Sequence, residues 1–201
     1  MARNTEERRT KLREKLIDIA EARIAEEGLS AIKARALAQE AGAAVGAIYT
    51  VFDDLTDLIL EVNGRTFKRL GVAVSEAAHA AADETPSDHL VALGLAYLQF
   101  AKTETLAWRT LFEVELTEGH AVPGWYLAEM QKLFSYIGRP VTALYPDLGE
   151  ADSQLMVRAL FSSVHGIVWL GLERRISGVP TEELPRMIEL TLRNLSENRN
   201  I

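Results

Sequence analysis

Apolar side chains recur with the 3.6-residue period of an amphipathic helix along almost the whole chain. No segment shows the sustained two-residue alternation, rich in β-branched residues, that a half-buried strand requires. The pattern therefore predicts an all-α protein of about nine helices. The first helix is expected over residues 5–27, with Gly28 as its stop, because glycine readily follows the last residue of a helix.

Two short helices are predicted over residues 33–41 and 44–52, and they meet at Gly42. The acidic run 53–57 is expected to begin a fourth helix that continues to about residue 82, because carboxylates favour a helix N-terminus. A supported pair of short helices with a glycine turn is the layout of a helix-turn-helix, whose second helix enters the major groove. Such pairs also occur as plain packing elements, so the spacing alone leaves both interpretations open.

The charge of the chain is unevenly distributed. The net charge of -7 argues against a nucleic-acid partner, because binding to phosphates depends on Lys and Arg. Residues 1–70 hold 12 basic and 12 acidic side chains, however, and the remaining residues carry the whole excess of acid. The first 15 residues hold six basic and three acidic side chains, which favours either a basic arm or a solvated helix face.

Composition excludes several kinds of site and compartment. The chain has no cysteine, so a disulfide framework, a thiolate zinc site and a cysteine nucleophile are excluded. The charged N-terminus lacks the apolar run of a signal peptide, and we expect a cytoplasmic protein. The longest uncharged run, residues 159–172, has 14 residues and is too short to span a bilayer, so it predicts a buried helix and no membrane partner.

One continuous region resembles a known family. It contains Ile19 and Ala20, the run Glu26–Gly28, the run Arg35–Phe52, and Leu58 and Ile59. These residues, at their fixed offsets, resemble the signature of the tetracycline-repressor (TetR) family over about residues 12–60. The resemblance implies a three-helix DNA-binding head over residues 1–53 and a larger ligand-binding and dimerisation domain over residues 54–201. It implies that the DNA-facing positions are Arg35, Ala44, Val45, Ala47, Tyr49 and Thr50.

The residue types at several of these positions also have a physical explanation that does not depend on the family resemblance. Gly42 permits a tight turn, and Gly46 lets the second helix approach a backbone or phosphate closely. Ile48 and Phe52, four residues apart, are expected to point together into the small core of the head. Tyr49 then points outward, where its hydroxyl can bond a phosphate, unless it is a half-buried packing residue.

Three departures from the family pattern predict weaker DNA binding. Lys33 and Ala44 stand where capping Thr and Ser are usual, and Ala44 cannot accept a capping bond, at a cost of about 1 kcal/mol. Leu55 stands where the family usually has a phosphate-contacting Lys. The small apolar surface of the second helix suits thymine methyl groups better than paired hydrogen bonds.

The C-terminal part is rich in large side chains that are either core fillers or ligand contacts. We expect ligand contacts from Tyr97, Trp108, Phe112, Trp125, Tyr126, Met130, Phe134, Phe161, His165 and Trp169. The TetR resemblance implies an enclosed cavity for a largely apolar effector, although His165 can equally bond a backbone carbonyl. The other histidines, at positions 79, 89 and 120, lack metal-ligand spacing and are predicted to lie on the surface. No catalytic constellation, metal site or cofactor site is expected, so the chain is not predicted to be an enzyme.

The last two helices, expected over about residues 150–177 and 181–198, carry a long apolar stripe. By the TetR resemblance they form a four-helix bundle with a second copy, which predicts a homodimer. The leading hypothesis is a repressor that binds a palindromic double-stranded DNA operator as a dimer and is released by a small molecule. The alternative is a helical small-molecule-binding protein whose head has weakened or lost DNA binding.

Overall fold

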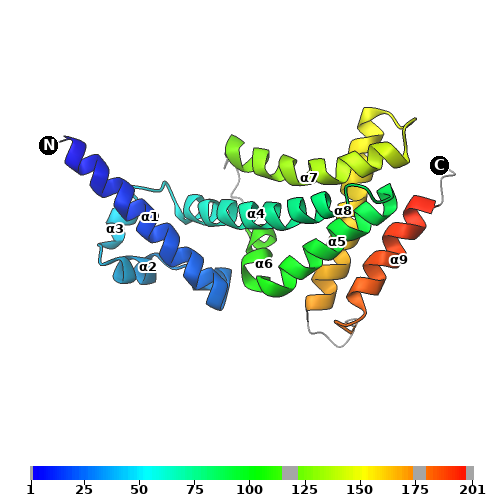
Figure 1. Cartoon of the computed structure of the whole chain (residues 1–201). Helices are drawn as coiled ribbons and strands as arrows, with labels where there is room; N and C mark the ends of the chain where they lie inside the picture. Colours follow the sequence, from blue (N-terminus) through cyan, green and yellow to red (C-terminus); the bar gives the residue numbers. More distant parts are fainter. Residues whose placement is uncertain (1, 115–121, 174–179, 198–201) are drawn as a thin grey trace. The chain divides into compact units, whose positions relative to one another are not determined.

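The structure is a computed structural model that describes residues 2–114, 122–173 and 180–197. Within these residues the chain is all-helical, as predicted, with nine α-helices, one short 3-10 helix and no strand (Figure 1). Two compact units are present. Unit 1 consists of Met1–Lys68 and Glu104–Tyr126, and unit 2 consists of Arg69–Thr103 and Leu127–Ile201.

The N-terminal helices follow the predicted pattern closely. The elements in chain order are α1 (Ala2–Glu27), α2 (Ala34–Ala41), α3 (Val45–Ile48) and α4 (Leu55–Ala80). Gly28 follows α1 with a positive φ of 80°, and its N–H donates to the carbonyl of Ile24 at 3.0 Å, so the predicted stop is confirmed. The expected second helix of the pair is shorter than predicted, because only Val45–Ile48 is α-helical and turns follow.

The predicted acidic start of α4 is confirmed, and two hydrogen bonds show how its carboxylates stabilise the helix end. The side chain of Asp54 accepts a hydrogen bond from the backbone N–H of Asp57 at 2.9 Å. The side chain of Asp57 in turn accepts one from the backbone N–H of Asp53 at 3.2 Å. These reciprocal bonds satisfy N–H groups that have no partner inside the helix.

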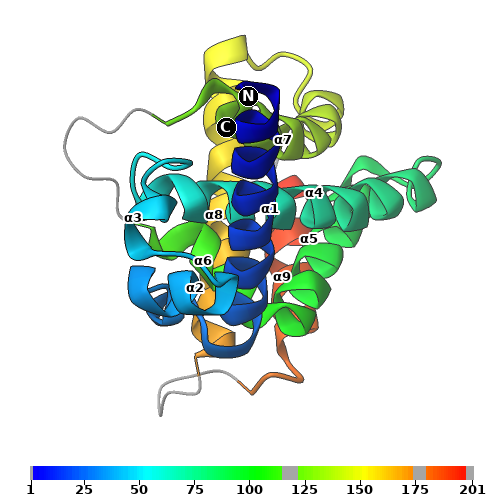
Figure 2. The ribbon, with the colours of Figure 1, turned by 90° about the vertical axis from the view of Figure 1, so that its left-hand side faces the viewer.

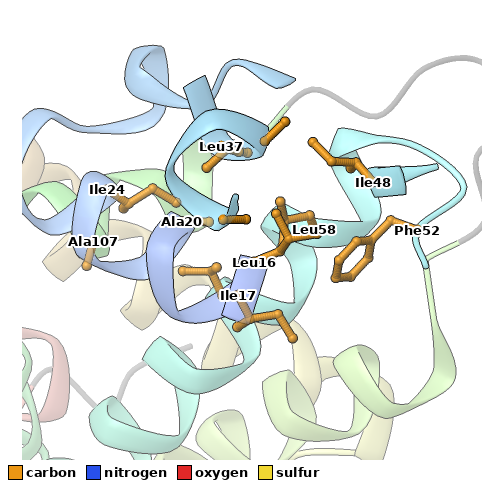
Figure 3. Packing of buried hydrophobic residues seen from close by; sticks show 12 residues of the cluster. Leu16, Ile17, Ala20, Ile24, Leu37, Ile48, Phe52, Leu58 and Ala107 are labelled. Atoms are coloured by element: carbon orange, nitrogen blue, oxygen red, sulfur yellow. The ribbon is translucent and has the colours of Figure 1, made fainter. Parts of the chain in front are cut away.

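Unit 1 has a core in which α1, α2, α3 and the start of α4 pack together (Figures 2 and 3). The predicted core residues Ile48 and Phe52 are buried there, together with Ile24 and Leu37. A helix from much later in the chain also takes part, because Ala107 of α6 (Thr105–Glu113) belongs to the same cluster. The sequence pattern does not reveal this contribution.

Unit 2 contains α5 (Pro86–Thr103), α7 (Gly124–Leu144), α8 (Glu150–Leu172) and α9 (Leu184–Glu197), apart from the first residues of α7. Helices α5, α8 and α9 pack on one another through very close approaches at glycine. A Cβ atom at Gly94 would lie 2.8 Å from Ile188, and one at Gly171 would collide with Leu184. The small residues therefore set the spacing between these three helices.

Three expectations for this part of the chain are corrected. Glycine at position 138 and proline at position 140 predict a helix break there, which is wrong, because α7 continues through Pro140 to the buried Val141 and Leu144. The uncharged run is part of the 23-residue α8, which is long and apolar enough by composition to cross a membrane, and only one of its faces is buried. His89 is buried and not on the surface, whereas His79 is exposed and residue 120 lies outside the described residues.

Candidate nucleic-acid interface and ligand sites

The turn between α2 and α3 has the geometry that a helix-turn-helix needs. Gly42 adopts the left-handed conformation, with φ 67° and ψ 34°, which a glycine enters without steric cost. The next N–H, on Ala43, donates to the carbonyl of Ala38 at 2.9 Å and closes the turn. A Cβ atom at Gly46 would touch nothing within 4 Å, so the backbone of α3 is open at that point.

Helix α3 is anchored by one side and exposes the other. Ile48 is fully buried and Phe52 nearly so, which fixes the orientation of this short segment. Tyr49 is 52% exposed and Val45 is 40% exposed, as an outward-facing helix side requires. Among the other residues predicted to face DNA, Arg35, Ala44 and Thr50 are exposed and Ala47 is half-buried.

The caps of the two short helices are weak, in agreement with the sequence. Neither Lys33 before α2 nor Ala44 before α3 makes a side-chain capping bond. The hydroxyl of Thr50 donates to the carbonyl of Ala47 at 2.7 Å, so its proton serves the end of α3 itself. The hydroxyl oxygen of Thr50 remains an acceptor, while Tyr49 carries the exposed phenol of this surface.

Several cations of the head are engaged inside unit 1, which sequence reasoning did not foresee. Arg9 donates to the carbonyl of Thr50 at 2.8 Å and Lys15 donates to the carbonyl of Ala41 at 2.9 Å, so both support the ends of short helices. Arg13 pairs with Glu61 and lies over the ring of Phe52. Among the described residues, five basic side chains of this unit make no ion pair or hydrogen bond: Arg8, Lys11, Lys33, Arg35 and Lys68.

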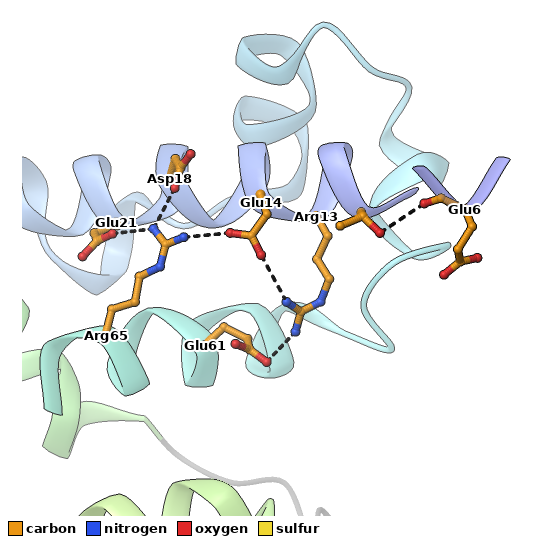
Figure 4. Close-up of polar contacts among 8 residues, drawn as sticks. Glu6, Arg13, Glu14, Asp18, Glu21, Glu61 and Arg65 are labelled. Atoms are coloured by element: carbon orange, nitrogen blue, oxygen red, sulfur yellow. Dashed lines mark hydrogen bonds and ion pairs between the residues drawn. The ribbon is translucent and has the colours of Figure 1, made fainter. Parts of the chain in front are cut away.

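A further cation joins α1 to α4 (Figure 4). Arg65 of α4 donates to Glu21 and Asp18 at 2.7 Å and to Glu14 at 3.0 Å, all on α1. The bonds to Glu21 and Asp18 raise the pKa of Arg65 above its ordinary value. These contacts fix α1 against α4, and they show why the basic residues of the first helices cannot all be counted as available to phosphates.

The residues predicted to contact a ligand fall into two separate groups. Unit 2 holds a cluster in which Tyr97, buried on α5, contacts Phe161 and His165 of α8. The hydroxyl of Tyr97 lies 2.8 Å from Nδ1 of His165, and the ring of Phe161 stacks on His165 at 5.5 Å with an angle of 19°. Phe134 and Trp169 border this cluster, and Met130 on α7 is half-buried. Burial lowers the pKa of His165 and favours the neutral imidazole.

The other group lies in unit 1. Trp108 is fully buried and packs edge to face with Phe112 at 5.8 Å. Tyr126 packs against Trp125 at 5.6 Å and against Phe67 at 5.1 Å. Sequence reasoning missed Phe67, which has the same helical spacing as ordinary core residues and no distinguishing neighbour.

Taken together, these features define an all-helical protein whose helix-turn-helix exposes its second helix. Residues 16–62 match the model of the bacterial regulatory proteins of the tetR family. Residues 90–195, more than half of the chain, match the tetracycline repressor-like C-terminal domain. The chain belongs to the TetR family and is a DNA-binding transcription regulator, as the sequence resemblance implied.

Solved structures show the same fold at low sequence identity. A protein of unknown function from Rhodococcus sp. RHA1 is 24% identical, with 90% of this chain and 93% of that chain covered and a TM-score of 0.70. A TetR transcriptional regulator from the same organism is 15% identical, with 96% and 99% covered and a TM-score of 0.61. A TetR-family regulator from Shewanella sp. PV-4 is 14% identical, with 93% and 96% covered and a TM-score of 0.64. No curated protein matches the chain in sequence.

Proposed function

We propose that the chain is a cytoplasmic repressor that binds a palindromic DNA operator as a homodimer and is released by a small apolar molecule. The observation that carries this proposal is the exposed surface of α3 on a helix-turn-helix whose opposite side is locked into a core. In this proposal residues 1–53 supply the DNA contacts and residues 54–201 supply ligand binding and dimerisation. The helix-turn-helix then places α3 in the major groove.

The exposed residues divide into two roles. Tyr49 and Arg35 offer a phenol and a guanidinium, which suit phosphate oxygens and fix the position of the head on the duplex. Ala44, Val45 and Ala47 offer small apolar groups, which suit thymine methyl groups. Thr50 accepts through its hydroxyl oxygen. With many cations of the head already paired internally, we expect modest affinity and a shallow dependence on salt.

The proposed dimer surface is the exposed side of α8, one of the last two helices, which were expected to form the interface. Leu160, Val164 and Val168 are buried against the chain's own helices, so they are not free for a second copy. On the other side of α8, Leu155 is 63% exposed and Leu170 is 62% exposed. The residues between them on that side are small or half-buried: Ala159, Ser162 and Gly166. A helix with large ends and a small middle can pack closely on its two-fold mate.

The two aromatic clusters are the proposed ligand-contacting groups, one in each unit. In unit 2 the contacts come from Tyr97, Met130, Phe134, Phe161, His165 and Trp169. In unit 1 they come from Trp108, Phe112, Trp125 and Tyr126. Such apolar surroundings with a few polar groups are typical of small-molecule sites.

The experiment that tests the proposal is selection of bound duplexes from a random DNA pool at two salt concentrations. We expect a palindrome whose half-sites are separated by about one helical turn, near 34 Å. Tyr49→Phe should weaken binding to that duplex by about three- to tenfold, since one hydrogen bond is lost. Leu127→Ala, at an exposed apolar position of unit 2, is the matched control and should bind as the wild type does.

Two outcomes would contradict parts of the proposal. If no duplex is enriched even at low salt, the head does not bind DNA and the chain is a helical small-molecule-binding protein. If Leu170→Glu remains a dimer by light scattering at micromolar concentration, the exposed side of α8 is not the interface. A monomeric wild-type protein would exclude the dimer altogether.

A further inference from the structure

The buried side-chain amide of Asn63 in unit 1 makes a hydrogen bond through its nitrogen but none through its oxygen. Asn63, on α4, is fully buried. Its Nδ2 group donates to the backbone carbonyl of Thr110 at 3.2 Å, near the C-terminal end of α6, where helix carbonyls lack a partner within the helix. This bond fixes the orientation of the amide, so Oδ1 is the atom that points away from Thr110. Among the described residues Oδ1 has no hydrogen-bond partner.

The neighbouring polar groups do not serve this oxygen. The hydroxyl of Thr66 donates to the carbonyl of Val62 at 3.2 Å, and the hydroxyl of Thr110 donates to that of Leu106 at 2.9 Å. Both hydroxyl protons are therefore used within their own helices. A buried acceptor that remains unpaired is costly, and native proteins keep few of them. An unpaired oxygen at this depth points to a partner that comes from outside the chain.

The surroundings of Asn63 are flat and aromatic. The phenol of Tyr126 contacts the Asn63 amide, and burial raises the pKa of that phenol, with the hydrogen bond from Asn63 opposing the rise. Phe67 and Trp125 pack edge to face on Tyr126. Trp125 also covers Gly64, where an added Cβ would lie 2.6 Å from the indole ring, and yet this tryptophan is 41% exposed. One exposed ring therefore covers the segment of α4 next to the buried oxygen.

We infer that Asn63 Oδ1 accepts a hydrogen bond from a small, flat effector that carries an N–H or O–H donor. This inference deepens the proposed function, since it rests on the chain being ligand-responsive. The effector is uncharged, because a charged molecule would pay a large desolvation cost among these rings. It binds in unit 1, beside α4, α6 and the residues Gly124–Tyr126, with Trp125 moving to admit it.

A ligand at this point would touch helices that build the core of the DNA-binding head. Val62, next to Asn63, and Ala107, one turn before Thr110, are both members of that core. A molecule that inserts between these helices shifts them relative to α1, on which Ala107 also packs. Ligand binding and DNA binding are then coupled within one compact unit.

The test compares indole with 1-methylindole, two probes of the same flat shape of which only indole has an N–H donor. Thermal unfolding of the full chain with each probe at equal concentration measures binding, because a ligand of the native state raises Tm. For the wild type we expect indole to bind about tenfold more tightly than 1-methylindole, the value of one hydrogen bond to a buried acceptor. Asn63→Leu should remove this preference, while Gln99→Leu, which deletes an exposed amide of α5, should keep it.

Other results overturn the inference. Equal responses to the two probes in the wild type, or no response to either, mean that the oxygen is satisfied by water or left unpaired. A preference that survives Asn63→Leu places the donor elsewhere. Should that variant fail to fold, the 15N spectrum of the wild type decides, since only indole should shift the Asn63 side-chain amide. Enrichment of a DNA palindrome without any indole response would leave the proposed function standing and reject this site alone.

Discussion

The two units of the molecule hold their helices together by different kinds of contact. Unit 1 joins its helices with an apolar core and with charged bridges at its edge, such as Arg65 to three carboxylates of α1. Unit 2 joins its helices by close approach at Gly94 and Gly171, and Arg193 of α9 forms an ion pair with Asp88 of α5 at 2.8 Å. The two aromatic clusters differ as well, because His165 and Tyr97 satisfy each other whereas Asn63 leaves an oxygen unpaired.

These two sites illustrate two kinds of buried polar group: one that is paired within the chain and one that is not. A mutually satisfied pair such as Tyr97 and His165 stabilises the packing and needs no further partner for that bond. An amide with one unpaired oxygen costs stability and is expected where another molecule completes it. The comparison therefore distinguishes a polar pair in unit 2 whose members bond each other from a buried acceptor in unit 1 that lacks a donor, and mutations test this distinction.

The largest expected effect is at Trp108. Trp108→Ala removes a fully buried ring from unit 1 and should lower the free energy of unfolding by about 3–5 kcal/mol. Urea unfolding at fixed protein concentration measures the change. Trp125→Ala, at a half-exposed ring of the same unit, should cost clearly less. If the two variants lose equal stability, the core of unit 1 does not extend to α6 as described.

A smaller effect is expected at Gly94. Gly94→Ala places a methyl group against the buried Ile188, and overpacking of this kind costs about 1–3 kcal/mol despite the higher helix propensity of alanine. Gly138→Ala in α7 is the control, because nothing lies within 4 Å of the added carbon. That control should gain about 0.5–1 kcal/mol. A gain at both positions would show that α5 and α9 can move apart freely.

A stabilising change is expected in the head. Ala44→Ser supplies a side-chain acceptor for the first N–H groups of α3 and should add about 1 kcal/mol to the free energy of unfolding. The backbone at Ala44 already has the extended conformation of a capping residue, with φ -72° and ψ 147°. Ala43→Ser, one residue earlier, is the matched control and should change little. No gain in Tm for Ala44→Ser would mean that α3 does not limit the stability of unit 1.

The smallest effect concerns pH and unit 2. Burial lowers the folded-state pKa of His165 below the unfolded value of about 6.5, so the unfolded chain takes up a proton first as pH falls. The stability contribution of His165 is complete above that pH and is lost as pH decreases toward the folded pKa. His165→Gln should flatten this part of the stability profile between pH 7 and pH 5. The buried His89, whose pKa is lowered by burial and by Arg139, contributes in the same direction and stays in place as the internal reference.

The sequence predicts the parts of this molecule that depend on short-range spacing. Gly42, Ile48 and Phe52 lie within eleven residues, so a turn and one helix face determine where they point. The pairing of Tyr97 with His165 spans 68 residues and depends on how α5 and α8 pack. The unpaired oxygen of Asn63 is likewise a property of tertiary structure, since an asparagine in a helix has no sequence mark that tells whether its amide is satisfied. At Pro140 the local sequence misleads in the other direction. Proline favours the end of a helix, but α7 continues through it because Val141 and Leu144, just beyond, are buried.

The place of α6 in unit 1 also sets an order of events during synthesis. The head of a nascent chain contains α1 to α3 long before Ala107 has been made, yet Ala107 is part of the core that those helices share. At a translation rate of about 5–20 residues per second, several seconds separate the emergence of Leu58 from that of Ala107. During that interval the head exposes an unfinished apolar surface. The core of the DNA-binding head therefore becomes complete only after much of the regulatory part has been synthesised.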